Sequence, residues 1–371
     1  MAGVYVHIPF CESRCKYCDF FSTTRLERRD VYVNAVAKEV EQRKNYLSSQ
    51  YIHTVYFGGG TPSMLSVEQM GRIMTELRKC YVFDEDAEIT TEANPSDIDE
   101  EKLRGWRDLG LNRLSIGIQS FQDAQLKQIG RRHNAEQARK AVRLAREAGF
   151  ENISIDLMYG LPGETLEAWK EDVEEALKLD VEHVSAYCLS YEEGTPLTRA
   201  LRRGEIEEVD EETENAMYDY LTERLARAGI ERYEVSNFAK RGYESQHNSS
   251  YWNGTPYLGL GAGAHSYDGK TRQWNVSDLE QYVRGVENGE TYFEREVLTE
   301  NDLYNEYVML KIRTRDGVEL SKVPRSMQDV CKGVAKIYGE SGKLRMENGD
   351  RLVATQEGIH ILNRIIEDLM I

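Results

Sequence analysis

The stretch GVYVHIPFCESRCKYCDFF, residues 3–21, joins a predicted strand to three closely spaced cysteines. Residues 4–8 are mostly apolar and predict a buried strand that stops at Pro9. Cys11, Cys15 and Cys18 follow with C-x3-C-x2-C spacing. Three thiolates this close together can ligate one metal centre, and soft thiolates suit an iron–sulfur cluster. A 4Fe–4S cluster held by three cysteines keeps one iron free for a further ligand, which is the main hypothesis for this loop.

Two other interpretations compete for the same cysteines. A disulfide would use two of the thiols and leave the third unpaired, and nothing in the sequence points to an oxidising compartment. A structural zinc site would need a fourth thiolate, or a histidine at zinc-finger spacing, and neither follows. His7 lies on the predicted strand and fits a buried core histidine as well as a ligand. The spacing favours the cluster.

The composition limits the classes of partner. The chain has 64 acidic and 47 basic residues and a net charge of −17, so it lacks the basic footprint of a general nucleic-acid binder. No apolar run approaches the roughly 18 residues of a membrane span, and no signal-peptide pattern is visible. Cys80, Cys188 and Cys331 are far apart and fit the buried thiols of a reducing cytosol. We therefore expect a cytoplasmic location.

Predicted strands and helices alternate six times between residue 3 and about residue 190. After the first strand, further strands are predicted at 54–57, 87–92, 113–119, 153–159 and 183–190, and amphipathic helices, the first at 31–47, separate them. Ser66 and Gln69 form a predicted capping box at the start of one helix. This alternation predicts an α/β fold with a parallel sheet and right-handed crossovers. Six units are too few for a closed eight-stranded barrel, so we expect an open, partial (β/α)6 barrel.

Residues with polar or unusual side chains follow the carboxyl ends of five successive strands. They are the three cysteines, Gly58-Gly59-Gly60, Glu92, Gln119 and Asp156. In α/β barrels this edge holds the active site, so a ligand is expected across it, in contact with the cluster. The carboxylates and Gln119 can accept hydrogen bonds from an ammonium or from ribose hydroxyls, and Arg131 can pair with a carboxylate. The glycine run fits close approach to a ligand and fits a plain tight turn equally well.

The motifs YVHIPFC, GGGTP, TTEANP, LSIGIQSF and DLMYGLPG, together with the cysteine spacing, resemble the radical S-adenosylmethionine superfamily. Within it they are similar to the branch of the oxygen-independent coproporphyrinogen III oxidases. The resemblance implies that a 4Fe–4S cluster and S-adenosylmethionine bind at the barrel rim. It places Tyr5, Tyr17, Gly59, Gly60, Thr61 and Glu92 at the nucleotide beside the cluster. Gln119, Arg131, Asp156, Ser190 and His265 match positions that in the oxidase hold a second S-adenosylmethionine.

Two departures point away from the oxidase. The oxidase has a fourth cysteine where this chain has Phe20. The segment HNSSYW, residues 247–252, resembles the H-N-x-x-Y-W signature of the heme chaperones of this superfamily. His247 is then the candidate axial ligand to heme iron, Tyr251 and Trp252 offer faces for the porphyrin, and His265 is the second candidate ligand. From spacing alone, a structural histidine beside two anchoring aromatic residues explains the segment better, and only the resemblance reverses this preference.

The resemblance thus implies a heme chaperone that binds the cluster, S-adenosylmethionine and heme and passes heme to client hemoproteins such as respiratory enzymes. This interpretation does not make the chain an enzyme. The alternatives are an oxygen-independent coproporphyrinogen III oxidase of porphyrin biosynthesis, against which Phe20 argues, and a radical-dependent enzyme that modifies heme. Peripheral contact with a membrane and a homodimer that depends on the cluster both stay open.

The 371 residues are predicted to form three parts: the barrel (1–235), a region with the HNSSYW segment and a Gly-rich loop that closes the site (236–296), and a C-terminal unit (297–371). In the last part, Thr299 and Asp302 form a predicted capping box before a helical stripe. Two more helices, a hairpin within 344–355 and a last helix from Gly358 resemble a winged-helix module. Because acidic residues dominate the chain, we expect a lid or a client-binding surface there, and no binding of nucleic acid.

Overall fold

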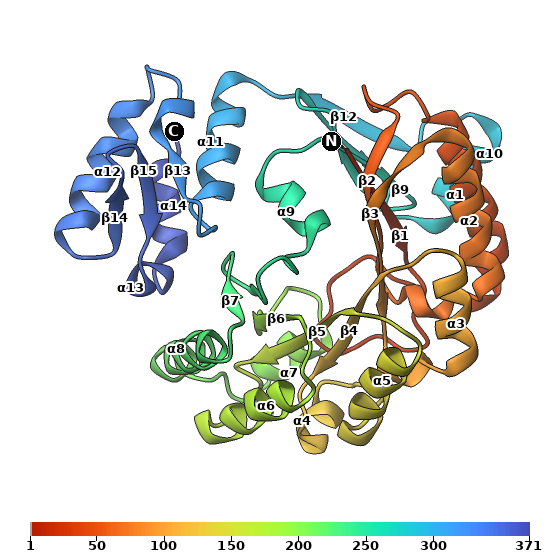
Figure 1. Ribbon diagram of the computed structural model, residues 1–371, viewed down its shortest axis with the longest axis horizontal. Coiled ribbons are helices and arrows are strands. Elements are labelled where there is room, and N and C mark those ends of the chain that lie inside the picture. Colours follow the sequence, from red (N-terminus) through yellow and green to blue (C-terminus); the bar gives the residue numbers. More distant parts are fainter. Residues whose placement is uncertain (1) are drawn as a thin grey trace.

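The computed structural model describes residues 2–371, and its largest part is one 12-stranded sheet (Figure 1). Six neighbouring strands of this sheet are parallel and follow one another in chain order. They are β1 (Gly3–Ile8), β2 (Tyr51–Gly59), β3 (Val82–Ala93), β4 (Arg113–Gln119), β5 (Asn152–Tyr159) and β6 (His183–Cys188). The predicted α/β fold with an open, partial parallel barrel is confirmed.

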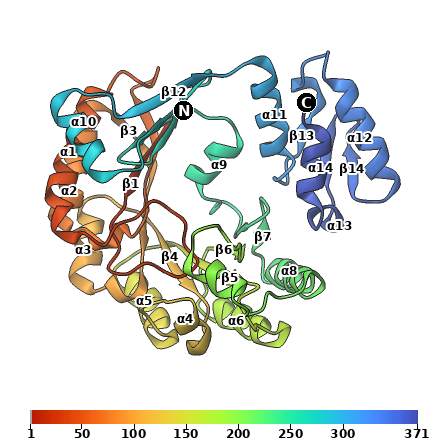
Figure 2. The same cartoon turned by 180° about the vertical axis from the view of Figure 1, so that it is seen from behind.

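A row of helices covers the outer face of these strands (Figures 1 and 2). Each has an apolar stripe that faces the sheet; in one of them, Ala138, Ala141 and Val142 are buried. The predicted capping box of Ser66 and Gln69 is present. The first helix is shorter than predicted and ends at Gln42. The row consists of α1 (Arg29–Gln42), α2 (Val67–Cys80), α3 (Glu100–Asp108), α5 (Ala135–Glu147) and α6 (Leu166–Lys178); α4 (Asp123–Gln128), α7 (Pro196–Arg202) and α8 (Glu211–Arg227) complete this half.

The strands carry apolar side chains on the helix side and polar ones on the inner side. On β4, Leu114 and Ile116 belong to the large hydrophobic core, whereas Arg113 and Ser115 alternate with them and are also buried. The hydroxyl of Ser115 donates to Asp156 on the next strand. The barrel therefore has its hydrophobic core outside the sheet and a polar interior, which is where a polar ligand can be held.

Both edges of the sheet extend beyond the predicted strands. At the β1 edge, β9 (Tyr257–Leu260) runs parallel to β1, and the antiparallel strands β10 (His265–Tyr267), β11 (Thr271–Asn275) and β12 (Phe293–Val297) follow it. At the other edge lie β8 (Asn237–Ala239) and β7 (Glu231–Arg232). Helix α10 (Leu279–Asn288) packs beside α1. Where we expected mainly loops over the site, the structure has short regular strands.

Helix α9 (Gln246–Trp252) contains the HNSSYW segment and lies between the barrel and the C-terminal elements (Figure 1). It contacts the amino-terminal ends of the barrel strands, since His247 meets Thr54 near the start of β2 and the first turn meets Glu88 on β3. The cysteine loop follows the opposite, carboxyl end of β1. The two motifs singled out from the sequence thus lie at opposite ends of the barrel.

The C-terminal elements have a hydrophobic core of their own, which includes Val308, Leu352 and Ile365. The predicted small helical unit with a hairpin is confirmed, as is the capping box of Thr299 and Asp302. One of the two helices predicted before the hairpin is only a single turn, Leu320–Lys322. The unit comprises α11 (Glu300–Lys311), β13 (Val318–Glu319), α12 (Gln328–Glu340), β14 (Leu344–Glu347), β15 (Arg351–Ala354), α13 (Gln356–Ile359) and α14 (Leu362–Leu369).

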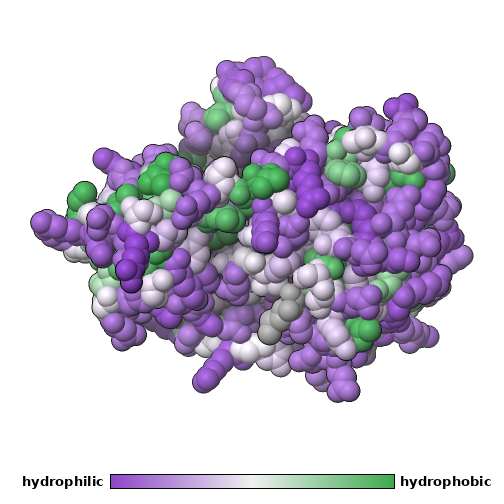
Figure 3. Space-filling model, turned by 90° about the horizontal axis from the view of Figure 1, so that it is seen from above, coloured by the Kyte–Doolittle hydropathy of each residue, from purple (hydrophilic) through white to green (hydrophobic). Residues whose placement is uncertain are grey.

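The surface agrees with the acidic, polar composition. From above, the molecule is mainly hydrophilic, with scattered hydrophobic residues (Figure 3). Within residues 2–371, the longest apolar helical stretches all fall short of what is needed to cross a membrane.

Candidate functional site

A cavity of about 420 Å³ lies at the carboxyl ends of the barrel strands. Most of the residues predicted for the cluster and the nucleotide meet there, although they come from every part of the barrel sequence. Those lining it are Cys11, Cys15, Cys18, Tyr17, Gly59, Gly60, Thr61, Glu92, Gln119, Arg131, Asp156 and Ser190. The polar residues at the strand ends therefore line one common cavity.

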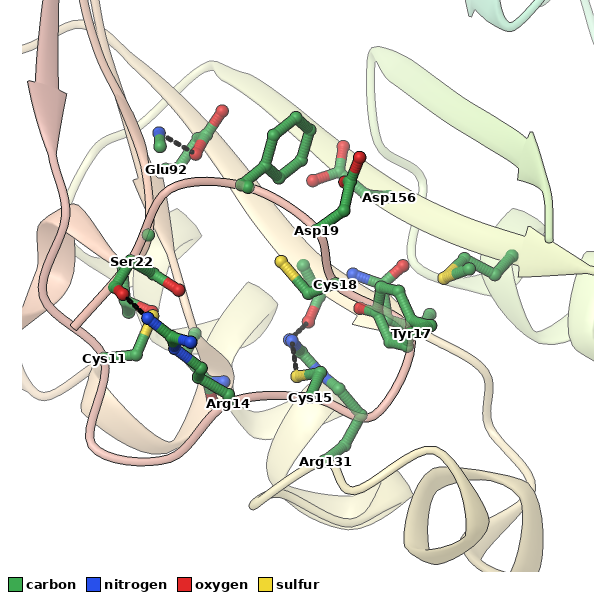
Figure 4. A pocket seen from close by; sticks show the side chains of 18 of the residues that line it. Cys11, Arg14, Cys15, Tyr17, Cys18, Asp19, Ser22, Glu92, Arg131 and Asp156 are labelled. Atoms are coloured by element: carbon green, nitrogen blue, oxygen red, sulfur yellow. Dashed lines mark hydrogen bonds between the residues drawn. The ribbon is translucent and has the colours of Figure 1, made fainter. Parts of the chain in front are cut away.

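The cysteine loop that follows β1 is held by main-chain hydrogen bonds and by the Arg14 side chain, whose bond to Ser22 is drawn in Figure 4. Cys11 N donates to Thr23 O over 2.9 Å, and Thr23 N donates to Pro9 O over 2.7 Å. The Arg14 side chain donates to Ser22 O. These bonds close the loop, whose three thiols line the cavity.

Each of two thiols already has a hydrogen-bond donor. Thr61 Oγ1 donates to Cys11 Sγ over 3.3 Å, and Arg131 Nη1 donates to Cys15 Sγ over 3.4 Å. Burial raises the pKa of Cys11, and burial together with the nearby thiols raises the pKa of Cys18 to about 11. Binding of iron would displace these protons, because the thiolate is the metal ligand.

The donor set fits an iron–sulfur cluster. Three soft thiols line one cavity, with the Arg131 cation beside one of them to balance thiolate charge. Within residues 2–371 we find no group of three or more ligating side chains close enough to hold a single metal ion. A cubic cluster binds its cysteines at separate irons, and so requires thiols that are farther apart than the ligands of one ion.

His7 supports the cysteine loop from below. Its Nε2 lies 2.9 Å from Phe21 O and its Nδ1 lies 3.1 Å from the Tyr5 hydroxyl. Burial lowers the pKa of His7 to about 4. Both ring nitrogens are engaged, so His7 is a satisfied core histidine. Tyr5, predicted at the nucleotide, lies in this supporting layer and outside the lining of the cavity.

The glycine run is explained by close packing against the same layer. Gly59 has a φ of +110°, and a Cβ there would lie 2.5 Å from His7 Cε1. A Cβ on Gly60 would lie 2.7 Å from the carbonyl carbon of Pro9. Since both glycines also line the cavity, the tight turn and the close approach to a ligand are features of the same backbone.

Two carboxyl groups, Glu92 and Asp156, form a polar wall of the cavity. Glu92 accepts from the Tyr56 hydroxyl over 2.9 Å and from Gly59 N over 3.1 Å, and Asp156 accepts from Ser115 over 3.1 Å. Burial, and secondarily the charge of Asp156, raises the pKa of Glu92 to about 7; burial also raises the pKa of Asp156. A cationic group of a ligand would be stabilised here.

Glu92→Gln should change how stability depends on pH. The pKa of Glu92 in the folded chain lies above its ordinary value of 4.5, so the folded state binds this proton more tightly than the unfolded state does. Wild-type stability therefore falls as pH rises from about 4.5 through 7. The neutral amide escapes this loss, and we expect the melting temperature of Glu92→Gln, relative to wild type, to rise between pH 5 and pH 8. The exposed Glu101→Gln is the control, and an unchanged difference would show that Glu92 is already ionised at pH 5.

Gln119 adopts an unusual backbone conformation at the rim. It is a buried non-glycine residue with a φ of +74°, and the pairing of β4 with β5 shifts register beside it. Such a conformation costs about 1 kcal/mol and persists where the surroundings require it. Gln119 is thus held in a strained position facing the cavity.

Gln119→Gly should raise the stability of the fold and lower the affinity for S-adenosylmethionine. Glycine adopts positive φ freely, so we expect the free energy of unfolding to rise by about 1 kcal/mol. The side chain that faces the cavity is lost, so the affinity for S-adenosylmethionine should fall several-fold. Urea denaturation and equilibrium dialysis measure the two quantities. A drop in stability would show that the side chain stabilises the fold.

The remaining predicted residues lie away from the cysteine pocket or at its margin. Ser190 is exposed at the mouth of the cavity and bonds to Glu192. His265, at the start of β10, stacks on Trp274 with ring centroids 6.2 Å apart, and it does not line the cavity. Tyr251 and Trp252 are half-buried on α9.

His247 is buried and fully hydrogen-bonded. Its Nδ1 lies 2.8 Å from Thr54 Oγ1, and its Nε2 lies 2.9 Å from the Tyr251 hydroxyl. Its ring stacks on that of Tyr56 with centroids 5.1 Å apart. Burial lowers the pKa of His247 to about 3. In this arrangement neither ring nitrogen is free to bind iron.

Sequence reasoning missed several residues of the pocket. Met158, Tyr187 and Cys188 form a wall at the ends of β5 and β6, and Phe20 and Asp19 line the mouth. It also missed the buried charged residues of the barrel interior. The available signal was the two-residue alternation of polar side chains along strands such as RLSIGIQ, which marks a polar inner face.

Comparison with known proteins agrees with this geometry. Residues 5–176 match the radical SAM superfamily. The heme chaperone HemW of Bacillus subtilis is 38% identical over 349 residues, which cover 92% of this chain and 92% of that protein. HemW of Lactococcus lactis is 36% identical over 376 residues, covering 100% of this chain and 97% of that protein. The solved structure of the coproporphyrinogen III oxidase HemN of Escherichia coli superposes with a TM-score of 0.85 at 24% identity, over 99% of this chain and 89% of that one, and supports the fold.

A pocket with three cysteines at the rim of a partial barrel, and similarity over nearly the full length of both relatives, lead to one assignment. The chain belongs to the radical SAM superfamily and, within it, to the HemW family.

Proposed function

We propose that this chain is a heme chaperone, which binds a 4Fe–4S cluster, S-adenosylmethionine and heme and transfers heme to client hemoproteins. The observation that carries the proposal is the combination of a three-cysteine pocket, with Phe20 in place of a fourth cysteine, and the HNSSYW helix in one chain. Relatives of nearly the same length are named heme chaperones.

Cys11, Cys15 and Cys18 would hold the cluster, whose free iron and S-adenosylmethionine together supply one-electron chemistry when bound. The other residues of the pocket act on charge and position. Arg131 balances thiolate charge through its bond to Cys15. Glu92 and Asp156 would accept hydrogen bonds from the ammonium or the ribose of the nucleotide, and Gln119, Tyr17, Gly59, Gly60, Thr61 and Ser190 would line its remaining faces.

The heme site is proposed at the HNSSYW helix. Tyr251 and Trp252 are half-buried, and His247 carries the imidazole. To ligate iron, His247 must give up its bond to Thr54 or to Tyr251. His265, exposed on β10, is the second candidate ligand and needs no such rearrangement.

The test uses reconstituted, cluster-loaded protein under anaerobic conditions. Titration with heme, followed by mixing with a heme-free hemoprotein, should show saturable binding and transfer to the acceptor. His247→Ala should lower heme affinity at least several-fold and shift the heme absorption band, and His265→Ala is the matched variant. If only His265→Ala changes the spectrum, His265 is the ligand.

The same preparation tests the rival activity. With S-adenosylmethionine, a reductant and coproporphyrinogen III, a chaperone should release no protoporphyrinogen. Product formed over many turnovers would overturn the proposal and establish an oxidase.

Gel filtration with and without the cluster tests the cluster-dependent homodimer, and vesicle flotation tests peripheral membrane contact. Cell fractionation tests the inferred cytoplasmic location.

A further inference from the structure

Glu88, near the start of the inner face of β3, holds the first turn of α9. Its Oε1 accepts from His247 N and its Oε2 accepts from Gln246 N, both over 3.1 Å, and Ser245 Oγ lies 3.5 Å from Oε1. Glu88 is 4% exposed. One buried carboxylate therefore fixes the position of the helix that carries His247.

The charge partner of Glu88 is Arg113 on the neighbouring strand. Arg113 Nε lies 3.9 Å from Glu88 Oε2, so the ion pair is loose although Arg113 is only 1% exposed. Arg113 Nε has no hydrogen-bond partner within residues 2–371, and neither has the buried Thr90 Oγ1, which lies at the paired position on β3. Buried polar groups are normally hydrogen-bonded, so Arg113 Nε and Thr90 Oγ1 have hydrogen-bonding capacity that this arrangement does not use.

The same two strands connect this layer to the cysteine pocket. Inward residues alternate along each strand, from Glu88 through Thr90 to Glu92 on β3, and from Arg113 to Ser115 on β4. Ser115 pairs in register with Glu92 and donates to Asp156. Burial is the main influence on the pKa of Glu92, of Asp156 and of His247, and the charge of Arg113 contributes less at each: it opposes burial at the two carboxyl groups and adds to the lowering at His247.

We propose that Glu88 and Arg113 are positioning residues that hold α9, and with it His247, against β2 and β3, and that release the helix when a cationic ligand binds beside Glu92 and Asp156. This inference rests on the proposed function and deepens it. A cation at the pocket carboxylates repels the Arg113 guanidinium, whose Nε lies 3.9 Å from Glu88 Oε2 and would come within hydrogen-bond distance after a shift of less than about 1 Å. A closer Arg113 competes with Gln246 N for Glu88 Oε2, because a carboxylate prefers a charged donor. Loss of that bond leaves the first turn of α9 held to Glu88 only through Oε1, by His247 N and the weak contact of Ser245 Oγ, and so loosens it.

Movement of α9 would resolve the difficulty that both nitrogens of His247 are engaged. Once the first turn leaves Glu88, His247 can leave Thr54 and offer Nδ1 to iron. The sulfonium and ammonium groups of S-adenosylmethionine supply the cation. Heme uptake at one end of the barrel would thus depend on nucleotide at the other.

Hydrogen exchange of the full-length, cluster-loaded chain tests this coupling through the amides of residues 246–252. In wild type, saturating S-adenosylmethionine should speed exchange of these amides about five- to tenfold. Glu88→Gln should exchange fast with or without the nucleotide. Arg113→Gln should show no response, and Arg113→Lys, which keeps the cation, should restore part of it. Glu244→Gln, just before α9 and paired with Arg315, is the matched control and should behave as wild type.

A second measurement tests the inference even when a variant does not fold. If Arg113→Gln does not fold, carbethoxylation of His247 in wild type should still accelerate with S-adenosylmethionine. Wild-type α9 exchange that ignores bound nucleotide, or a full response in Arg113→Gln, would overturn the inference. Nucleotide binding and heme binding are measured on the same samples. If the chaperone proposal is wrong, heme does not bind. If the coupling is wrong, the nucleotide binds and the exchange of the α9 amides does not change.

Discussion

Cys15→Ala should yield a folded chain without a cluster. Cys15 is one of only three thiols in the loop, and an iron left without its thiolate loses the soft ligand that retains it. The residue lies in a loop and is only half-buried, so the sheet and its helices lose little packing. We expect bound iron to fall more than tenfold, with a change in melting temperature of only a few degrees. Cys11→Ala and Cys18→Ala should behave alike.

Cys188→Ala is the matched control, because Cys188 is the fourth thiol that lines the same cavity. It should retain the cluster in full. Iron analysis and the absorption of the reconstituted protein measure the loss, and circular dichroism verifies the fold. Unchanged iron in Cys15→Ala, or lost iron in Cys188→Ala, would show that the cluster ligands are assigned wrongly.

The barrel half of the molecule was accessible from the sequence because its signals are local. Each strand of the barrel is an apolar run next to an amphipathic helix, and each polar residue at a strand end is adjacent to that run. Parallel strands place their carboxyl ends along one edge, so Glu92, Gln119 and Asp156 could be brought together without knowing any distance.

The β9–β12 edge and the place of α9 could not be predicted in this way. Strands β9 to β12 have three to five residues each, and glycines such as Gly259 and Gly261 lie in or beside them. The alternation of apolar and polar side chains is therefore too short to be recognised in the sequence. His247 contacts Thr54, which is 193 positions away in the chain. Contacts of that range depend on how the strands pack together, and neither spacing nor composition encodes them.

Glu39 illustrates the same limit and gives the second large effect. The sequence places it on an amphipathic helix, where a glutamate is ordinarily exposed, yet it is 0% exposed. It accepts from Arg43 over 3.2 Å, from Asn275 over 2.8 Å, and from Tyr282 over 2.6 Å, and Gly261 N donates to it over 2.8 Å. One carboxylate on α1 therefore joins the barrel to the strands and the helix that follow α9.

Glu39→Ala should lower the free energy of unfolding by about 3–5 kcal/mol, because it removes the counter-charge of the buried Arg43 and leaves the Tyr282 hydroxyl and Gly261 N without an acceptor. The loss should be concentrated at residues 257–288, where hydrogen exchange should accelerate before the parallel strands open. The exposed Glu41→Ala, two positions along the same helix, should change stability by less than about 0.5 kcal/mol. Urea denaturation gives both values. Equal effects of the two variants would mean that helix propensity at α1, and not the buried carboxylate, stabilises this junction.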